Sequence, residues 1–245
     1  MALVTRRIGG AVAALALLLT ARTTFAVDGV VLIDEAAVLA GGITSGDGPG
    51  YPVTISDPGS YRLSENLKVP AGISGFWIET NDATLDLNGF TILGAGPGSG
   101  FADGIFIFGN NVEVRSGTVR DFGRHGIFSR NAGKCFDCTD AEGVRIVDVR
   151  AIGNGFNGIR LESQGGLVEG CSAHTNGNAG INAQGNGTLV KNSVARNNKT
   201  YGIIGGSNSG YRSNVLTANN GGDLNPQVLG GVNLGENLCG TAVCP

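Results

Sequence analysis

Residues 158–203 read GIRLESQGGLVEGCSAHTNGNAGINAQGNGTLVKNSVARNNKTYGI, two stretches of equal length that each open on Gly-Ile, followed by a third Gly-Ile. Counting the earlier copies, the glycines of this dipeptide stand at 104, 126, 158, 180 and 202, so the intervals are 22, 32, 22 and 22. Without residues 131–140, the long interval equals the others. A repeat this short cannot bury an apolar face alone, so it must stack on its neighbours. The sequence therefore predicts a solenoid.

The residues that follow each Gly-Ile glycine alternate between apolar and variable positions, which is typical of a half-buried strand. Two further columns of small and branched apolar residues recur in each repeat. Their members are Val114, Ile146, Val168 and Val190 in one column, and Val119, Ala151, Ala173 and Ala195 in the other. No repeat has a helical period. We therefore predict an all-β fold, a right-handed parallel β-helix of about 7–8 coils whose strands pair from coil to coil.

One polar column recurs at the same spacing as Gly-Ile and consists of Asn154, Asn176, Asn198 and Asn220. Stacked asparagines hydrogen-bond to one another along such an axis, and asparagine tolerates the left-handed backbone of a tight turn. The column could alternatively form a polar binding strip. We interpret it as a structural asparagine ladder.

The two ends of the chain differ in character from the repeats. In residues 1–26, Arg6 and Arg7 precede an apolar stretch that is followed by a small-residue cleavage site, which predicts a secretory signal and a secreted or periplasmic protein. We expect an N-terminal cap over 27–50, with a short helix from Asp34 to Ala40 that ends at Gly41. The β-helix should span 51–238, with 131–140 as an inserted loop, and 239–245 should form a C-terminal cap.

Charge and hydropathy limit the partners of the mature chain. Residues 1–26 hold three arginines and no acidic residue, so the remainder carries 14 basic and 20 acidic residues. This balance argues against a nucleic acid partner. The apolar stretch in 1–26 is too short for a membrane span.

Five cysteines in a secreted chain predict disulfides. Cys135 and Cys138 form one local pair, and Cys239 and Cys244 form another. In a stacked-coil fold these pairs lie about four coils apart, roughly 19 Å at ~4.8 Å per coil, which excludes a shared zinc site. Free thiols are the alternative to two disulfides. We expect Cys171 to be a buried packing residue, and we expect no metal and no cofactor.

The glycine-isoleucine strands, the asparagine turns and the coil length resemble the right-handed parallel β-helix (pectin-lyase-like) superfamily. The segments GGITSGDGPGYPVTI (41–55), PGSYRLSENL (58–67) and ATLDLNGFTI (83–92) resemble the start of secreted bacterial β-helix repeat proteins of unassigned function. The resemblance implies the fold. It does not imply one activity, because the fold carries lyases, hydrolases, epimerases, adhesins and non-catalytic proteins.

The resemblance places a site on the outer face of the sheet that the insertion 131–140 borders. The outward residues there combine aromatic rings, cations and amides, which suit the apolar faces and polar groups of a polysaccharide. The alternative is that the insertion covers the phenylalanines, or that Arg130 and Glu162 form only a surface ion pair. The predicted substrate-binding residues are Phe106, Phe108, Phe128, Arg130, Arg160, Glu162, Asn182 and Gln184.

A candidate catalytic group consists of Asp103 and His125, which both precede Gly-Ile and stack one coil apart. A neighbouring carboxylate should raise the pKa of His125 and fix its tautomer. In a metal-free elimination, His125 takes the proton while Arg160 or Arg130 neutralises a uronate. A simple polar turn is the alternative. The galacturonan hydrolases of the superfamily that this chain resembles carry an Asp-Asp pair and a Gly-His-Gly segment. Arg124-His125-Gly126 matches that segment only in part and no Asp-Asp pair exists here, so the resemblance favours a lyase over a glycoside hydrolase.

Together these features predict a secreted β-helix protein that binds, and in one version processes, extracellular polysaccharide. The alternatives are a non-catalytic structural or cell-surface interaction protein and a metal-free polysaccharide lyase.

Overall fold

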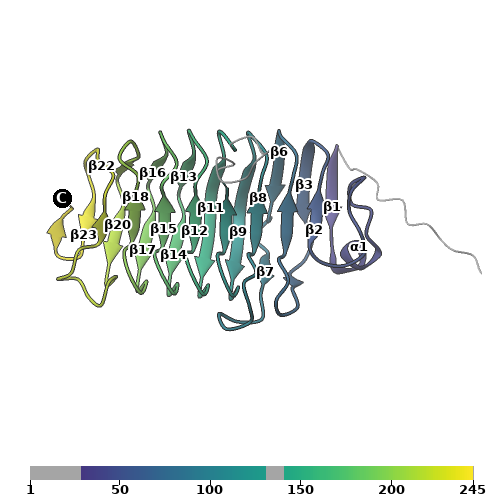
Figure 1. Cartoon of the computed structure of the whole chain (residues 1–245), viewed down its shortest axis with the longest axis horizontal. Helices are drawn as coiled ribbons and strands as arrows, with labels where there is room; N and C mark the ends of the chain where they lie inside the picture. Colours follow the sequence, from purple (N-terminus) through teal and green to yellow (C-terminus); the bar gives the residue numbers. More distant parts are fainter. Residues whose placement is uncertain (1–28, 131–140, 245) are drawn as a thin grey trace, which may run out of the picture.

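The computed structural model describes residues 29–130 and 141–244. Its strands stack along one long axis, with the first strands at one end and the C terminus at the other (Figure 1). The predicted signal at 1–26, the insertion 131–140 and the expected Cys135–Cys138 disulfide lie outside the described residues.

The Gly-Ile strands form one continuous parallel sheet, which we call the Gly-Ile sheet. Each strand pairs in register with the next, so that the isoleucines after the five Gly-Ile glycines align. Its order is β2 (Val53–Ile55), β5 (Phe76–Ile78), β8 (Ile105–Ile107), β10 (Ile127–Ser129), β12 (Ile159–Leu161), β15 (Ile181–Ala183), β18 (Ile203–Gly205) and β21 (Val228–Leu229).

The second sheet has 16 strands and supplies the remaining sides of each coil. Its longer members are β1 (Val30–Ile33), β3 (Gly59–Leu63), β6 (Ala83–Asp86), β9 (Glu113–Arg120) and β11 (Arg145–Ile152). Its short members are β4 (Leu67–Lys68), β7 (Thr91–Leu93), β13 (Leu167–Glu169), β14 (Ser172–His174), β16 (Leu189–Lys191), β17 (Val194–Arg196), β19 (Gly210–Arg212), β20 (Val215–Thr217), β22 (Val232–Asn233), β23 (Leu238–Cys239) and β24 (Ala242–Val243).

A left-handed residue marks the same corner in four successive coils, whether it lies inside one long strand or between two short ones. Ser116 and Asp148, with φ of 58° and 53°, bend β9 and β11 in the middle. Gly170 and Asn192 occupy the same position and separate β13 from β14 and β16 from β17. One corner of the coil is thus set by a positive φ, which glycine, asparagine and aspartate adopt most easily.

The core runs along the axis inside the coils. The isoleucines of the Gly-Ile column are at most 1% exposed, as are Val114, Ile146, Val168 and Val190 of the second predicted column. This arrangement confirms the all-β parallel β-helix. The number of coils stays a prediction.

A short helix stands at the N-terminal end of the stack (Figure 1). Helix α1 (Glu35–Ala40) begins after Asp34, whose Oδ1 accepts the N–H of Ala37 at 2.7 Å, and ends at Gly41 with φ of 69°. Both termini of the helix match the prediction, whereas its role as a cap stays a prediction. At the other end β24 pairs antiparallel with β23, and Cys239 and Cys244 form the predicted disulfide. Cys171 is free and buried, as predicted.

The asparagine ladder exists, with one correction. Asn154 Nδ2 donates to Asn176 Oδ1 at 3.1 Å, and Asn176 Nδ2 donates to Asn198 Oδ1 at 2.9 Å. The next member is Asn219, which accepts from Asn198 Nδ2 at 2.8 Å; the prediction of Asn220 was wrong. Asn220 is partly exposed, with φ of 54°.

The register changes by one residue in the turn after β18. The N–H of Gly187 donates to Asn208 O, and Asn186 and Asn208 keep the regular spacing of the repeats. Leu189 instead pairs with Gly210, one position sooner than that spacing requires. The last full repeat is therefore one residue short, so the regular spacing points to Asn220 while the ladder residue is Asn219.

Gln227 ends this ladder. Its Oε1 accepts both the N–H and the Nδ2 of Asn219 at 3.0 Å, in place of another asparagine. Its Nε2 donates to the carbonyls of Gly222 and Asn225 at 2.9 and 2.7 Å. Both polar atoms of the Gln227 amide are used within the turn, so no unpaired amide is left at the buried end of the column.

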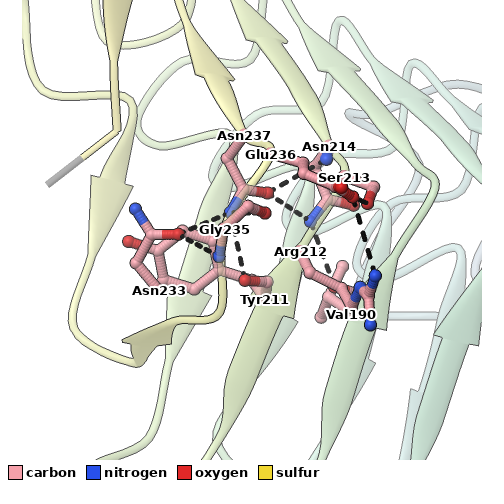
Figure 2. A network of polar contacts seen from close by, with 9 residues as sticks. All are labelled: Val190, Tyr211, Arg212, Ser213, Asn214, Asn233, Gly235, Glu236 and Asn237. Carbon is pink, nitrogen blue, oxygen red and sulfur yellow. Dashed lines mark hydrogen bonds and ion pairs between the residues drawn. The ribbon is translucent and has the colours of Figure 1, made fainter.

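A second ladder occupies the corner between β19 and β20 (Figure 2). Asn237 Oδ1 accepts the N–H and the Nδ2 of Asn214, both at 3.0 Å. Asn214 Oδ1 in turn accepts the N–H of Ser193 at 3.0 Å, and Asn237 Nδ2 donates to Asn233 Oδ1 at 2.8 Å. This ladder was not predicted, because the one-residue shift hides Asn214 from the regular period.

Candidate functional site

On the outer face of the Gly-Ile sheet, one column of side chains consists of three aromatic residues followed by an arginine. Successive strands align Trp77, Phe106, Phe128 and Arg160 side by side. Trp77 was not among the predicted site residues. The segment Gly75-Phe76-Trp77-Ile78 has the same alternation as Gly104-Ile105-Phe106-Ile107, and that similarity could have identified it.

The aromatic rings differ in how much of their surface meets solvent. Phe106 and Phe128 stack with centroids 4.9 Å apart and planes 6° apart, and Phe108 lies 4.1 Å from Phe106. Phe128 is only 5% exposed, whereas Trp77 is 37% exposed. Phe106 and Phe108 are partly exposed, so together with Trp77 they present the accessible apolar surface, and the buried Phe128 packs against Phe106. How the insertion 131–140 lies relative to these rings falls outside the described residues.

Two guanidinium groups lie over the ring of Phe128, Arg124 at 4.9 Å and Arg160 at 5.3 Å from its centroid. Such contacts use the negative face of the ring to hold a cation. A pocket of about 280 Å³ opens here. Its lining residues are Phe106, Arg124, Phe128, Arg130, Arg160 and Glu162. Arg124 was not predicted, because it lies on the turn before β10 and not on the strand.

Some polar atoms around the pocket have hydrogen-bond or ion-pair partners, and others that are buried have none in the described structure. Glu162, which follows β12, forms an ion pair with Arg160 of that strand. Asn182, on the next strand, is 6% exposed, and its Oδ1 has no hydrogen-bond partner in the described structure. Arg160 Nε is also buried and unpaired there. Gln184 is exposed at the edge of the same face. The pocket is lined by three arginines and one glutamate, and Asp103 pairs with Arg124, so these described side chains carry one more positive than negative charge.

Asp103 and His125 are neighbours, as predicted, but their contacts differ from the prediction. Asp103 Oδ1 accepts the backbone N–H of His125 at 3.0 Å, and Asp103 Oδ2 accepts from Arg124 at 3.1 Å. His125 Nδ1 accepts the N–H of Asn157 at 3.2 Å, and Asn157 Oδ1 accepts that of Ala179 at 3.1 Å. Each side chain thus holds the backbone of the next coil, which makes this column a third ladder.

The expectation of a raised histidine pKa was wrong. Burial, and then the positive charges of Arg124 and Arg160, lower the pKa of His125 to about 3. Burial raises the pKa of the Asp103 carboxyl, and the Arg124 cation opposes that rise. Because Nδ1 accepts a backbone N–H, the neutral imidazole carries its proton on Nε2. His125 is therefore a weak base at neutral pH.

Neither a metal-binding cluster nor a membrane-spanning helix occurs in the part of the chain that the structure describes. Among residues 29–130 and 141–244, no three His, Cys, Asp or Glu side chains gather in a way that could hold a metal ion. Over the same ranges, no helix is long and apolar enough to cross a membrane.

A family model described as the right-handed β-helix region matches residues 103–233. The chain belongs to the right-handed β-helix family. The match covers the Gly-Ile repeats, most of the ladder residues and the cationic pocket. No curated protein sequence matches this right-handed β-helix protein.

Two solved structures are similar to this chain at low sequence identity. The A-module of the mannuronan C-5 epimerase AlgE4 of Azotobacter vinelandii is 13% identical, with 82% of this chain and 70% of that chain covered and a TM-score of 0.45. The Dettilon tailspike protein (gp208) is 16% identical, with 68% of this chain and 41% of that chain covered and a TM-score of 0.38.

Proposed function

We propose that this right-handed β-helix protein binds an acidic polysaccharide along the outer face of the Gly-Ile sheet. The observation that carries the proposal is the continuous column in which Trp77 and Phe106 lead into the pocket lined by Arg124, Arg130 and Arg160. Apolar faces of sugar rings stack on aromatic side chains, and guanidinium groups bind carboxylates through paired hydrogen bonds. One face therefore offers both contacts that a uronate chain needs.

The arrangement suits an extended ligand. Neighbouring strands are about 4.8 Å apart, so Trp77 and Phe106 offer aromatic surface over two neighbouring coils, and the buried Phe128 backs Phe106 from the next coil. The cationic pocket lies at one end of this surface and is large enough for a single sugar unit. We infer that a polymer lies along the β-helix axis with one carboxylate in the pocket.

Binding without chemistry is the version that the geometry supports best. An elimination would need a base beside the pocket, and His125, the candidate from the sequence, has its Nδ1 occupied and its pKa lowered to about 3. The Cys239–Cys244 disulfide supports an oxidising compartment, outside the cytoplasm, as the place of action. Secretion is part of the same proposal.

The test is affinity electrophoresis or calorimetry with uronate polymers such as polygalacturonate and alginate, and with a neutral glucan for comparison. Trp77→Ala should weaken binding of the uronate polymer by about tenfold, since it removes an exposed aromatic platform. Arg160→Gln should have a similar or larger effect by removing a carboxylate partner.

Two control variants remove the same types of side chain, one apolar and one cationic, at positions away from the proposed binding surface. Leu229→Ala removes an exposed apolar side chain, 48% exposed, from the far end of the same sheet. Arg196→Gln removes an exposed cation from β17 on the other sheet. Both should bind as the wild type does. Equal binding by all four variants would place the polymer away from this face. No binding to any polymer would favour a structural or cell-surface interaction protein.

A further inference from the structure

The sequence contains six Asn-Gly bonds, and the structure treats one of them differently from the other five. Their asparagines are Asn88, Asn154, Asn157, Asn176, Asn186 and Asn220. In such a dipeptide the backbone nitrogen of the glycine can attack the side-chain amide carbon of the asparagine, because glycine has no Cβ to obstruct the approach. The reaction needs a glycine nitrogen that is free to move.

In five of the six pairs, the glycine N–H donates to a carbonyl of a neighbouring coil. These bonds join Gly89 to Ser116 at 2.6 Å, Gly155 to Phe122 at 2.8 Å, Gly158 to Ala179 at 3.1 Å, Gly177 to Asn154 at 2.8 Å, and Gly187 to Asn208 at 3.2 Å. Asn154, Asn157 and Asn176 are also buried, and their side chains belong to the ladders.

Asn220–Gly221 lacks this protection. Gly221 is exposed, and within the described residues its N–H makes no hydrogen bond. Asn220 is partly exposed, and its Nδ2 makes a single long contact of 3.3 Å to Pro226 O. The cause is the shortened repeat, which places Asn219 in the ladder and leaves Asn220 beside it.

We propose that Asn220 is a site of spontaneous deamidation through a succinimide. The Gly221 nitrogen forms a bond to Asn220 Cγ, the bond from Cγ to the side-chain nitrogen breaks, and ammonia leaves with the displaced proton. Water then opens the ring at either carbonyl and gives aspartate or isoaspartate. The net change is one water consumed and one ammonia released, with no oxidant or reductant.

The product changes the turn that closes the first ladder. Asn220 O accepts the Asn225 side chain at 2.7 Å, and this turn positions Gln227 under Asn219. Isoaspartate adds one carbon to the main chain between Asn219 and Gln227. The modified turn should therefore hold Gln227 less well, and the C-terminal coil should open more often than in fresh protein.

The test needs only the full chain, kept folded in warm, mildly alkaline buffer and followed by peptide mapping for the gain of about one dalton. Asn220 should convert at least roughly fivefold faster than any other Asn-Gly, since each of the others must first break a backbone hydrogen bond. Asn186 is the internal control, because it is more open to solvent than Asn220 but its glycine N–H is bonded.

Two further measurements separate the proposed chemistry from exposure alone. Asn220→Gln should suppress ammonia release from the folded protein, and isoaspartyl methyltransferase should label the aged wild type but not this variant. In the aged protein, amide exchange around Val228 should be faster than in fresh protein. Conversion of Asn186 or Asn88 at the rate of Asn220 would overturn the proposal, as would aged protein without label. None of these outcomes depends on whether the protein binds polysaccharide.

Discussion

Asn219 Oδ1 accepts two hydrogen bonds from Asn198, one from its backbone N–H at 3.0 Å and one from its side-chain amide at 2.8 Å. Both residues are at most 2% exposed. One oxygen thus satisfies two buried donors of the preceding coil, and the same pattern recurs at Asn176 and Asn198. At this turn the side-chain amides supply acceptors for buried backbone N–H groups, as capping side chains do at the ends of helices.

Removal of one ladder amide should be costly. Asn198→Ala removes the acceptor of the buried Asn176 backbone N–H and leaves the Nδ2 of Asn176 with only the carbonyl of Ala151. We expect the free energy of unfolding to fall by about 2–3 kcal/mol, as measured by urea denaturation. The control is Asn220→Gly, which lies outside the ladder at a positive φ and should change stability by less than about 0.5 kcal/mol. Similar losses in both variants would contradict the assigned register.

The lowered pKa of His125 predicts a stability that depends on pH. A histidine that resists protonation in the folded state favours the unfolded chain once pH falls below the ordinary value of about 6.5. With a folded pKa of about 3, His125 should remove about 2 kcal/mol of stability between pH 6.5 and pH 5.

The variant His125→Asn tests this dependence. Asn157 occupies the same column and accepts the next backbone N–H through Oδ1, so asparagine can replace the imidazole as an acceptor. The variant should show a flatter pH dependence than the wild type, and the difference isolates His125 from His174, whose pKa burial also lowers. An imidazole nitrogen NMR signal that titrates near pH 6.5 would argue against the buried, neutral form.

Reduction of the Cys239–Cys244 disulfide should loosen only the C-terminal end. Closure of so short a loop is worth about 2 kcal/mol. Stacked coils contact only their neighbours, so the effect should be local. Asn233 Nδ2 donates to Cys244 O at 2.9 Å, which links the disulfide to the second ladder. In the double variant Cys239→Ser/Cys244→Ser, amide exchange should quicken in β22 and β23 and stay unchanged in β10 and β12.

Salt should separate the two halves of the proposed binding surface. Contacts between the arginines of the pocket and a uronate weaken as ionic strength rises, whereas stacking on Trp77 does not. Raising salt should therefore weaken binding by the wild type more than binding by Arg160→Gln, in titrations against one polymer. Parallel salt curves for both proteins would place the polymer away from the pocket.

The repeats made much of the fold predictable. A dipeptide at a constant spacing fixes which side chains stack, so the Gly-Ile sheet, the buried columns and the first three ladder asparagines followed from counting. Counting failed where the spacing changed. One residue is absent opposite Gly187, and that shift moved the fourth ladder position to Asn219 and hid the second ladder.

The site was harder to predict because two of its residues are not identified by the Gly-Ile spacing. Trp77 belongs to a coil without a Gly-Ile, and Arg124 lies on a turn. Asp103 alone would raise the pKa of His125. Burial, and then the positive charges of Arg124 and Arg160, lower the pKa of His125 instead, and Arg124 also pairs with the Asp103 carboxylate. The order of residues along a column does not show how deeply His125 is buried or how close the guanidinium groups of Arg124 and Arg160 lie to it.

Gln227 has a consequence for anyone who wishes to change the length of this protein. In the first ladder, the amide donors of each asparagine depend on the side-chain oxygen of the next coil. Gln227 ends this dependence, because its own amide donates to carbonyls within a single loop. A version cut after an earlier coil would leave the backbone N–H of its last ladder asparagine without an acceptor, and the Nδ2 of that residue without the next ladder oxygen. The Oδ1 of that asparagine would still accept from the coil before it. Whole coils should therefore be added or deleted only before residue 219, and residues 219–227 should be kept together at the C-terminal end of any new version.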